Sequence, residues 1–377
     1  MRGGKREQGW RGLAGAGIAL AMLAAPAAWP MSAAADPPSA QFFGVSPASA
    51  EQLTDEEYDR MGAAEIGTLR VAFYWPHIQP PTQAGEPGGE PGYKWADTDR
   101  IVARAAANGM EVLPFVYGTP PWTAHDPRVP PVRSERARRG WEDLFRALIE
   151  RYGPGGEFWA DPTLAPQGID PKPITSWQIW NEPNSPTFFK QGHNTASEYA
   201  RTLDIAARAI RETDPDATIV LAGMFASPSG GELFEQFLGR LFSIGGVGED
   251  FDALGMHPYA PKMDKLRLRF DFALAVMHGH GIDKPIWVTE MGWPTGGTKL
   301  GNFRKSPSGQ AAILRRSFDL LLARRDDWGI QRIVWYTWRD NRLLPSCDIC
   351  SYSGLFKRKG GPKPAWYAFV DYTGGKP

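Results

Sequence analysis

The sequence predicts a single-domain (β/α)8 barrel, an α/β fold in which eight parallel strands alternate with helices. Short apolar runs recur along the chain, with amphipathic, helix-like segments between them. Several of these runs are continuously apolar rather than alternating, which is typical of parallel strands that are covered on both faces. The length of 377 residues also suits one barrel of this kind.

The expected elements follow one another in regular order. The candidate strands are residues 42–45, 68–75, 111–117, 174–180, 218–223, 251–256, 286–289 and 332–337. Apolar residues at helical spacing predict helices over 198–213 and 311–323, and the segment 363–369 is expected to be the last helix, packed back on the barrel. An open doubly wound sheet is the alternative, but it would need a glycine-rich nucleotide turn after the first strand, which Gly44-Val45-Ser46-Pro47 does not supply.

The N-terminus is typical of a secretory signal peptide. Basic residues precede an apolar run at 13–28, and Ala33-Ala34-Ala35 ends the segment. Because the apolar run is shorter than the roughly 20 residues that span a bilayer, we expect cleavage after Ala35 rather than stable membrane insertion. This divides the chain into a signal peptide, residues 1–35, and one barrel domain, residues 36–377, that is exported; a retained membrane anchor is the alternative.

The charge balance narrows the range of partners. The sequence holds 42 Lys and Arg residues against 42 Asp and Glu residues, so its formal net charge is zero. A nucleic-acid or anionic-membrane partner would favour a basic excess, so neither is expected. We expect a monomer that needs neither a metal nor another cofactor.

Two glutamates come at the ends of candidate strands. Glu182, in WQIWNEPN, ends the fourth strand, and Glu290, in WVTEMGW, ends the seventh. Active sites of (β/α)8 barrels lie on the side where the strands end, and the fourth and seventh strands face each other across that side. Two facing carboxyls suit glycoside hydrolysis, in which one protonates the departing oxygen and the other attacks the sugar carbon or activates water.

With these residues in place, the sequence resembles the clan A glycoside hydrolases, which are retaining enzymes on a (β/α)8 barrel. The resemblance covers nearly the whole mature chain and is greatest to family 39, with family 5 next. It extends to residues outside the glutamate pair: Arg70 in TLRVAFYW, Asn181 in NEP, His257 and Tyr259 in GMHPYA, and Trp338 in WYTWRD.

The resemblance implies a role for each matched residue. It makes Glu182 the acid/base and Glu290 the nucleophile, and Arg70 would keep the nucleophile ionised. Asn181 would bind the sugar 2-hydroxyl, and His257 and Tyr259 would contact the carboxyls or the substrate. Aromatic rings can pack on the apolar face of a sugar, and the candidates for this are Trp338, Trp75, Trp122 and Trp293.

Structural readings compete with these roles. A strand arginine can simply neutralise a structural carboxylate, and large aromatic residues often belong to the core. Two other functions also remain open: a carbohydrate-binding protein on an inactive barrel, and a transglycosylase that uses the same residues. The sequence leaves the sugar, its linkage, and endo or exo action undetermined, since these depend on loops at 76–94, 119–133, 183–195, 294–306 and 340–360.

The two cysteines, Cys347 and Cys350, lie three positions apart in CDIC. Export favours a local disulfide. Free thiols are the alternative, while a zinc site would need further ligands that no second CxxC or nearby His pair offers. The segment follows the eighth strand, so it is expected on the rim of the active site.

Overall fold

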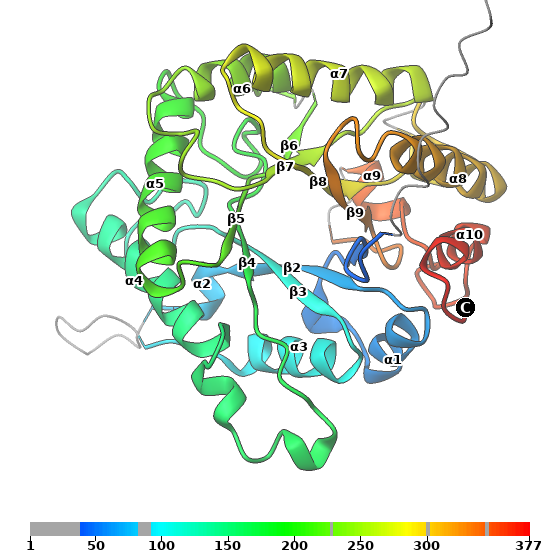
Figure 1. Ribbon diagram of the computed structural model, residues 1–377, viewed down its shortest axis with the longest axis horizontal. Helices are drawn as coiled ribbons and strands as arrows, with labels where there is room; N and C mark the ends of the chain where they lie inside the picture. Colours follow the sequence, from blue (N-terminus) through cyan, green and yellow to red (C-terminus); the bar gives the residue numbers. More distant parts are fainter. Residues whose placement is uncertain (1–37, 82–91, 227–228, 299–301, 344–346) are drawn as a thin grey trace, which may run out of the picture. The chain divides into compact units, whose positions relative to one another are not determined.

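Parallel strands arranged around a central axis form the core of the structure (Figure 1). The structure is a computed structural model that describes residues 38–81, 92–226, 229–298, 302–343 and 347–377. The barrel is one compact unit spanning Pro38–Pro377. The predicted signal peptide and most of the expected loop at 76–94 lie outside the described residues.

The described sheet has nine strands in the order β5-β4-β3-β2-β1-β9-β8-β7-β6. Their bounds are β1 Phe43–Ser46, β2 Thr68–Tyr74, β3 Glu111–Tyr117, β4 Ser176–Ile179, β5 Thr218–Leu221, β6 Met224–Phe225, β7 Leu254–His257, β8 Ile286–Met291 and β9 Ile330–Tyr336. All the pairings between these strands are parallel.

The fifth barrel position is occupied by β5 and β6 together. β5 pairs with β4, whereas β6, two residues further on, pairs with β7. An isolated parallel bridge between Val220 and Ala253 links β5 to the chain just before β7. The sheet therefore closes into a barrel with eight strand positions, and the predicted (β/α)8 architecture is confirmed.

Helices surround the sheet on its outer side (Figure 1). They are α1 Asp55–Ala63, α2 Trp75–Ile78, α3 Ala96–Ala107, α4 Glu135–Tyr152, α5 Thr195–Thr213, α6 Phe234–Phe242, α7 Met263–Gly279, α8 Pro307–Ala323, α9 Asp348–Tyr352 and α10 Pro364–Thr373, with 3-10 turns at Ala50–Gln52, Glu157–Ala160 and Ala165–Gln167. The two helices predicted over 198–213 and 311–323 exist and begin a few residues earlier than expected. The predicted last helix is α10, which packs against α8 through Phe318 and Phe369.

Every second side chain of each strand points into the barrel and fills its inside. On β2, Thr68 and Arg70 point inward, and they lie opposite Glu111 and Leu113 of β3. Arg332 of β9 bonds both Thr68 and Glu111, so a polar layer closes the end where the strands begin. The inward positions at the other end of the barrel are therefore left to form the site.

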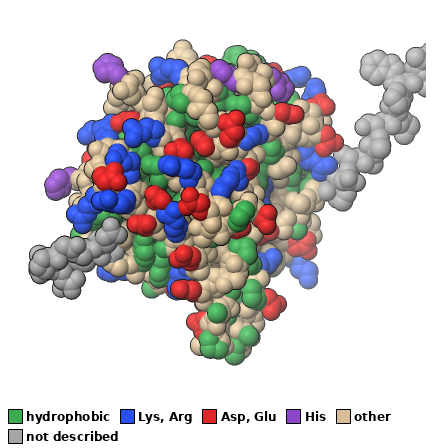
Figure 2. All heavy atoms as spheres, turned by 60° about the vertical axis from the view of Figure 1, so that its left-hand side comes forward, with side chains coloured by type: hydrophobic (Ala, Val, Ile, Leu, Met, Phe, Trp, Pro, Cys, Tyr) green, Lys and Arg blue, Asp and Glu red, His purple; other side chains and the backbone are tan. Residues whose placement is uncertain are grey.

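On the face shown in Figure 2, positive and negative side chains are interspersed, as the balanced composition suggests. Among the residues that the structure describes, no helix combines the length and the apolar character needed to cross a membrane.

Candidate active site

Glu182 reaches the barrel mouth because the chain turns sharply after β4. Trp180 and Glu182 have φ angles of 72° and 42°, in the left-handed region that non-glycine residues seldom adopt. Backbone hydrogen bonds hold this turn, from Trp180 N to Val116 O at 2.8 Å and from Glu182 N to Gly223 O at 2.9 Å. The apolar run WQIW therefore ends in a turn that fixes the direction of the carboxyl group.

Glu290 reaches the same place from within a strand. The pairing of β8 with β9 is irregular between Val288 and Met291, which face Ile333 and Trp335. An extra residue of this kind re-aims side chains next to it. Thr289 bonds Gln178 inside the barrel, while Glu290 bonds Arg70. β8 runs two residues beyond the predicted strand, so Glu290 lies inside it rather than after it.

Arg70 is a fully buried cation, and each of its three nitrogens donates to a polar side chain. Its Nη1 donates to Glu290 Oε1 at 2.7 Å, and its Nη2 donates to Asn181 Oδ1 at 2.8 Å. Its Nε donates to Gln178 Oε1 at 2.7 Å, and the guanidinium lies 4.0 Å from the ring centroid of Phe115. A buried charge is costly unless it is paired, and here every side of the guanidinium has a partner.

His257 lies between the two carboxyls. Its Nδ1 is 2.8 Å from Glu182 Oε1, and its Nε2 is 3.7 Å from Glu290 Oε1. Gly223 permits this placement, because a Cβ there would lie 2.1 Å from His257 Nε2. Burial and the nearby Arg70 lower the pKa of His257 well below its usual value, so the ring is neutral.

The carboxyls themselves are close together and almost enclosed. The nearest oxygen atoms of Glu182 and Glu290 lie within 4.8 Å of each other, and their side chains are 12% and 10% exposed. Burial and the neighbouring Glu290 raise the pKa of Glu182 well above its usual value. Burial also raises the pKa of Glu290, but Arg70 and the Tyr259 hydroxyl, which donates to Oε2 at 2.9 Å, oppose this shift. The first proton therefore belongs to Glu182, and Glu290 is the carboxylate.

Among the residues that the structure describes, Glu182, His257 and Glu290 form a group that could hold a metal ion. However, the Arg70 guanidinium already bonds the inner oxygen of Glu290. A divalent cation bound by that oxygen would sit beside a buried positive charge, which Coulomb repulsion disfavours. The donor set therefore fits an arginine-neutralised carboxylate better than a metal centre.

The structure brings together the sequence-predicted residues Glu182, Glu290, Arg70, Asn181, His257 and Tyr259, but it buries three of the four predicted tryptophans. Trp338 is 1% exposed, and its Nε1 donates to Glu57 on α1. Trp75 and Trp293 are equally buried, with ring nitrogens bonded to Gln79 and to the Ala260 carbonyl.

Trp122, which is half-buried, packs edge-on against Trp75 with Arg136 of α4 over its ring. The rings of Trp338, Trp75 and Trp293 are taken up by packing around the barrel and leave no face for a sugar. Trp122 keeps part of its side chain exposed, and its role as a sugar platform stays a prediction.

Sequence reasoning missed Gln178 and Tyr336. Tyr336 ends β9, and burial and the negative charges of Glu290 and Glu182 raise the pKa of its hydroxyl. Its neighbour Trp335 contacts Phe318 of α8, so the alternation of strand side chains turns Tyr336 into the barrel. The position of Tyr336 as the last inward residue of its strand was the signal that could have identified it.

The cysteines form a disulfide between Cys347 and Cys350 at the start of α9. The carbonyls at the other end of this helix accept hydrogen bonds from its surroundings. Tyr352 O accepts from Thr295 N after β8, and Ser353 O accepts from Trp335 Nε1 of β9. The disulfide-bearing turn is thus connected to both strands that carry Glu290 and Tyr336.

The barrel holds a protonated and an ionised carboxyl at the ends of its strands. This is the arrangement found in glycosidases that use two carboxyls. Within this class, the chain belongs to the glycosyl hydrolase catalytic core family, whose model matches residues 159–369. The fold is that of the clan A glycoside hydrolases, as the sequence resemblance implied, and neighbours of families 39, 10 and 5 all appear among similar structures.

Individual relatives are distant. The chain is 26% identical over 299 residues to endo-1,4-beta-xylanase C of Paenibacillus barcinonensis. The aligned region covers 74% of this chain and 26% of the xylanase. Among solved structures, a glucosidase from Croceicoccus marinus is similar with a TM-score of 0.64 at 16% identity, over 89% of this chain and 67% of that one.

A family 39 glycoside hydrolase from Bacteroides cellulosilyticus WH2 has a TM-score of 0.58 at 16% identity, over 88% of this chain and 63% of that one. The chain spans between 12% and 26% of the length of the curated relatives it matches.

Proposed function

We propose that this protein is a retaining glycoside hydrolase that cleaves the O-glycosidic bonds of a poly- or oligosaccharide by double displacement. The carboxyl separation carries the proposal. Retaining enzymes hold their two carboxyl groups about 5 Å apart, whereas inverting enzymes leave roughly 6.5–9.5 Å for a water molecule. One oxygen of Glu182 and one of Glu290 lie within 4.8 Å of each other, and the His257 ring reaches both carboxyls. The two groups therefore face the same narrow space, which supports the retaining mechanism.

The opposite protonation of the two groups supports the assignment of roles. Glu290, ionised beside Arg70, would attack the sugar carbon and form a glycosyl ester, while Glu182 would protonate the departing oxygen. The charge of Glu290 disappears in the ester, which lowers the pKa of Glu182 and prepares it to deprotonate the incoming water. Tyr259 and Arg70 would then stabilise the carboxylate as it is released.

Asn181 would contact the sugar next to the reacting carbon. Its Oδ1 is bonded to Arg70, which fixes the orientation of the amide and leaves its nitrogen to donate towards the substrate. In the family that the sequence resembles, the matching asparagine binds the 2-hydroxyl, and a bond at that position strengthens in the transition state. The same role is proposed for Asn181.

We also propose that the protein is exported and processed after Ala35. The basic head, the short apolar run and the alanine-rich end of residues 1–35 support this proposal. Export would bring the enzyme to polymers too large to enter a cell, which agrees with an activity on polysaccharides or their fragments.

The test is glycan hydrolysis by the residue 36–377 protein, with Glu290→Gln beside it. Xylan leads the panel because a relative is named as a xylanase, followed by gluco-, manno-, galacto- and arabino-glycans. We expect sugar release by the wild type and not by the variant, with the anomeric configuration retained when products are followed by NMR. Inversion of configuration, or equal release by the variant, would refute the mechanism. Glycan binding with no release by the wild type would instead support the carbohydrate-binding alternative.

A further inference from the structure

Three strands end in a tyrosine at the same edge of the barrel. β2 ends at Tyr74, β3 at Tyr117 and β9 at Tyr336. Tyr74 and Tyr117 lie opposite each other in the β2–β3 pairing. They share the inward parity of Arg70 and Phe115, whose side chains meet inside the barrel. The three rings therefore belong to the mouth that holds the carboxyls.

The hydroxyls of these tyrosines are free to bind a ligand. Within the described residues, none of the three hydroxyls has a hydrogen-bond partner, and each one has surface that solvent can reach. The hydroxyls of Tyr58, Tyr152, Tyr199, Tyr259 and Tyr372, by contrast, all bond other parts of the protein. Within the described residues, the hydroxyls of Tyr352 and Tyr367 also lack a partner, but neither residue ends a strand at the barrel mouth. The three mouth tyrosines therefore combine an unused hydroxyl with a position beside the carboxyls.

Tyr74, Tyr117 and Phe188 form a continuous aromatic wall, each ring partly exposed. The ring centroids of Tyr74 and Tyr117 are 5.0 Å apart, and those of Tyr117 and Phe188 are 6.0 Å apart. The chain after β3 makes room for this wall at Gly118, with φ of 85°, where a Cβ would lie 2.4 Å from the ring of Tyr74. Phe188 is anchored by its carbonyl, which accepts from Trp180 Nε1 at 3.1 Å.

We propose that this aromatic wall is a second sugar-binding subsite beside the catalytic carboxyls, so that the preferred substrate is an oligosaccharide of at least two sugar units. A pyranose or furanose ring offers an apolar C–H face to an aromatic ring and hydroxyls to the phenol groups. The wall provides both kinds of contact. The inference rests on the proposed glycoside hydrolase function.

The wall begins next to the cation that holds Glu290. The Arg70 guanidinium lies 4.0 Å from the ring centroid of Phe115, and the Phe115 ring stacks on Tyr117 with centroids 5.4 Å apart. Tyr74 and Phe188 in turn contact Tyr117, so the wall extends from the catalytic residues to the rim of the barrel.

The test measures binding as a function of chain length. The variant Glu290→Gln keeps bound oligosaccharides intact, and its affinity is measured by calorimetry for xylo-, cello-, manno- and galacto-oligosaccharides of one to six units, with ligand-observed NMR for the monosaccharides. We expect affinity to rise from one unit to two in at least one series. Adding Tyr117→Ala or Tyr74→Ala should lower the affinity for the disaccharide about tenfold, equivalent to about 1.4 kcal/mol. The affinity for the monosaccharide should not change.

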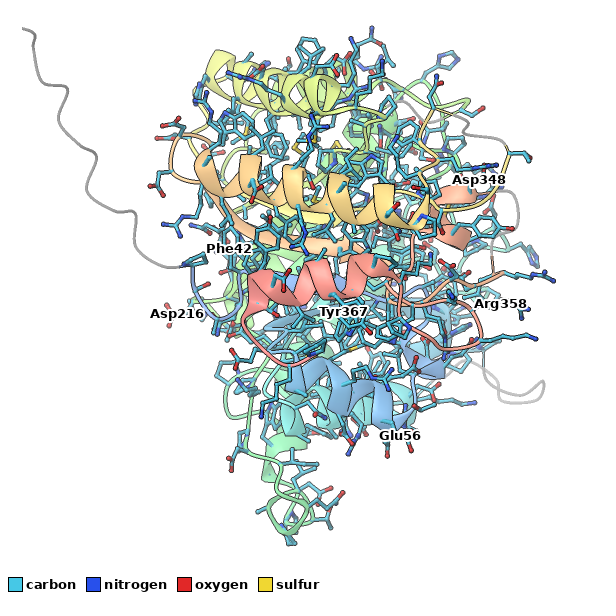
Figure 3. The ribbon with its side chains drawn as sticks, turned by 90° about the vertical axis from the view of Figure 1, so that its right-hand side faces the viewer. Phe42, Glu56, Asp216, Asp348, Arg358 and Tyr367 are labelled. Atoms are coloured by element: carbon cyan, nitrogen blue, oxygen red, sulfur yellow. A yellow bond between two sulfur atoms is a disulfide. The ribbon has the colours of Figure 1, made fainter. Side chains whose placement is uncertain are left out.

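Two kinds of variant guard against a folding artefact. Tyr74→Phe and Tyr117→Phe keep the ring and should lose less affinity than the alanine variants. Tyr367→Ala removes an exposed tyrosine from α10 on the outside of the barrel (Figure 3) and should change no affinity. Circular dichroism and thermal unfolding of each variant show whether the fold is kept.

The subsite is refuted if the alanine variants bind the disaccharide as well as their parent does, if they lose mono- and disaccharide affinity equally, or if no series binds. Hydrolysis by the wild-type protein is measured in parallel. Wall-dependent binding without hydrolysis would overturn the proposed function and keep the subsite. Hydrolysis together with binding that does not depend on the wall would support the proposed function and refute the subsite.

Discussion

The two carboxyls differ because their neighbours are distributed unequally. Arg70 and Tyr259 both bond Glu290, whereas Glu182 has only His257 as a side-chain partner within the described residues. A positively charged imidazolium there would stabilise the ionised form of Glu182 and lower its pKa. Because the pKa of His257 is well below its usual value, the ring stays neutral and Glu182 can remain an acid.

A first prediction concerns the acid. Glu182→Gln should slow hydrolysis of a natural oligosaccharide by about 10²–10⁴-fold, the usual contribution of general acid catalysis. Cleavage of the first bond in a dinitrophenyl glycoside should be much less affected, because that leaving group needs no proton. Pre-steady-state release of dinitrophenol measures this step by itself. Equal losses on both substrates would show that Glu182 is not the proton donor.

A second prediction links the same residue to stability. Because the pKa of Glu182 is raised in the folded protein, the folded state binds this proton more tightly than the unfolded chain does. Its contribution to stability is complete below the usual glutamate pKa of about 4.3 and is lost as the pH rises through the folded value. Glu182→Gln should therefore be more stable than the wild type at pH 8, and the difference should shrink towards pH 4.

Urea unfolding at a series of pH values measures this difference. Glu56, which is exposed on α1 (Figure 3), provides the control. Because the pKa of Glu56 is lowered rather than raised, Glu56→Gln should not be stabilised at high pH. If the difference in the free energy of unfolding between Glu182→Gln and the wild type did not depend on pH, Glu182 would not be the protonated carboxyl.

Sequence patterns located the carboxyls but not the aromatic contacts. Glu182 and Glu290 were recognisable because charged residues ended apolar runs at equivalent places. Trp338 was predicted to contact the substrate but is buried, because the direction of a side chain depends on where its strand stops. Alternation places Tyr336 inward, but β9 ends there, and two residues later Trp338 turns towards Glu57 of α1. A one-residue uncertainty in a strand end is enough to exchange one aromatic residue for another.

Individual elements contain irregularities that the sequence does not show. The fifth barrel strand is interrupted at Ala222 and Gly223, where the chain accepts His257 against Gly223. β8 contains the irregular pairing that aims Glu290. Both arise from contacts between strands far apart in the chain, so apolar periodicity within a single segment predicts the strands but not their breaks.

α9 acts as a brace between β8 and β9. Lys363, which is almost completely buried, donates to Asp340 Oδ1 at 2.7 Å, to Thr295 Oγ1 at 2.9 Å and to Tyr352 O at 3.1 Å. The segments after β8 and β9 therefore meet at the end of α9. The disulfide at the other end of this helix closes a loop of only four residues, which limits its effect on the unfolded chain to about 2 kcal/mol.

A third prediction follows for this brace. Reduction of Cys347–Cys350 by a dithiol such as dithiothreitol should raise KM several-fold, because α9 loses its fixed start, while the midpoint of thermal unfolding falls by only a few degrees. The Cys347→Ser/Cys350→Ser double variant should reproduce the reduced protein and be insensitive to dithiothreitol. An unchanged KM in both, or a native mass spectrum with two free thiols, would disprove the role.

At the scale of the whole molecule, the order of the elements was predictable and the closure was not. Repeated apolar runs established eight strands with helices between them, because each strand must be buried on both faces. The barrel closes between β5 and the chain before β7, where Val220 pairs with Ala253. No pattern in the sequence near either residue indicates this pairing. The barrel is nevertheless what makes the site, since it brings Arg70, Glu182 and Glu290 together from three distant segments.

The last prediction concerns the chain as it is made. The apolar run at 13–28 is too short to span a bilayer of about 30 Å as a helix, so the N-terminal segment should be removed rather than kept as an anchor. Expression of the full chain in a bacterial host with a secretory pathway should give an exported protein that begins at Asp36, as read by N-terminal sequencing and intact mass. Replacing Ala33 and Ala35 by bulky residues should block cleavage, while Ala40→Leu, beyond the cleavage site, should not. Recovery of the full-length chain in the membrane fraction would favour the retained anchor, and recovery in the cytoplasm would refute export.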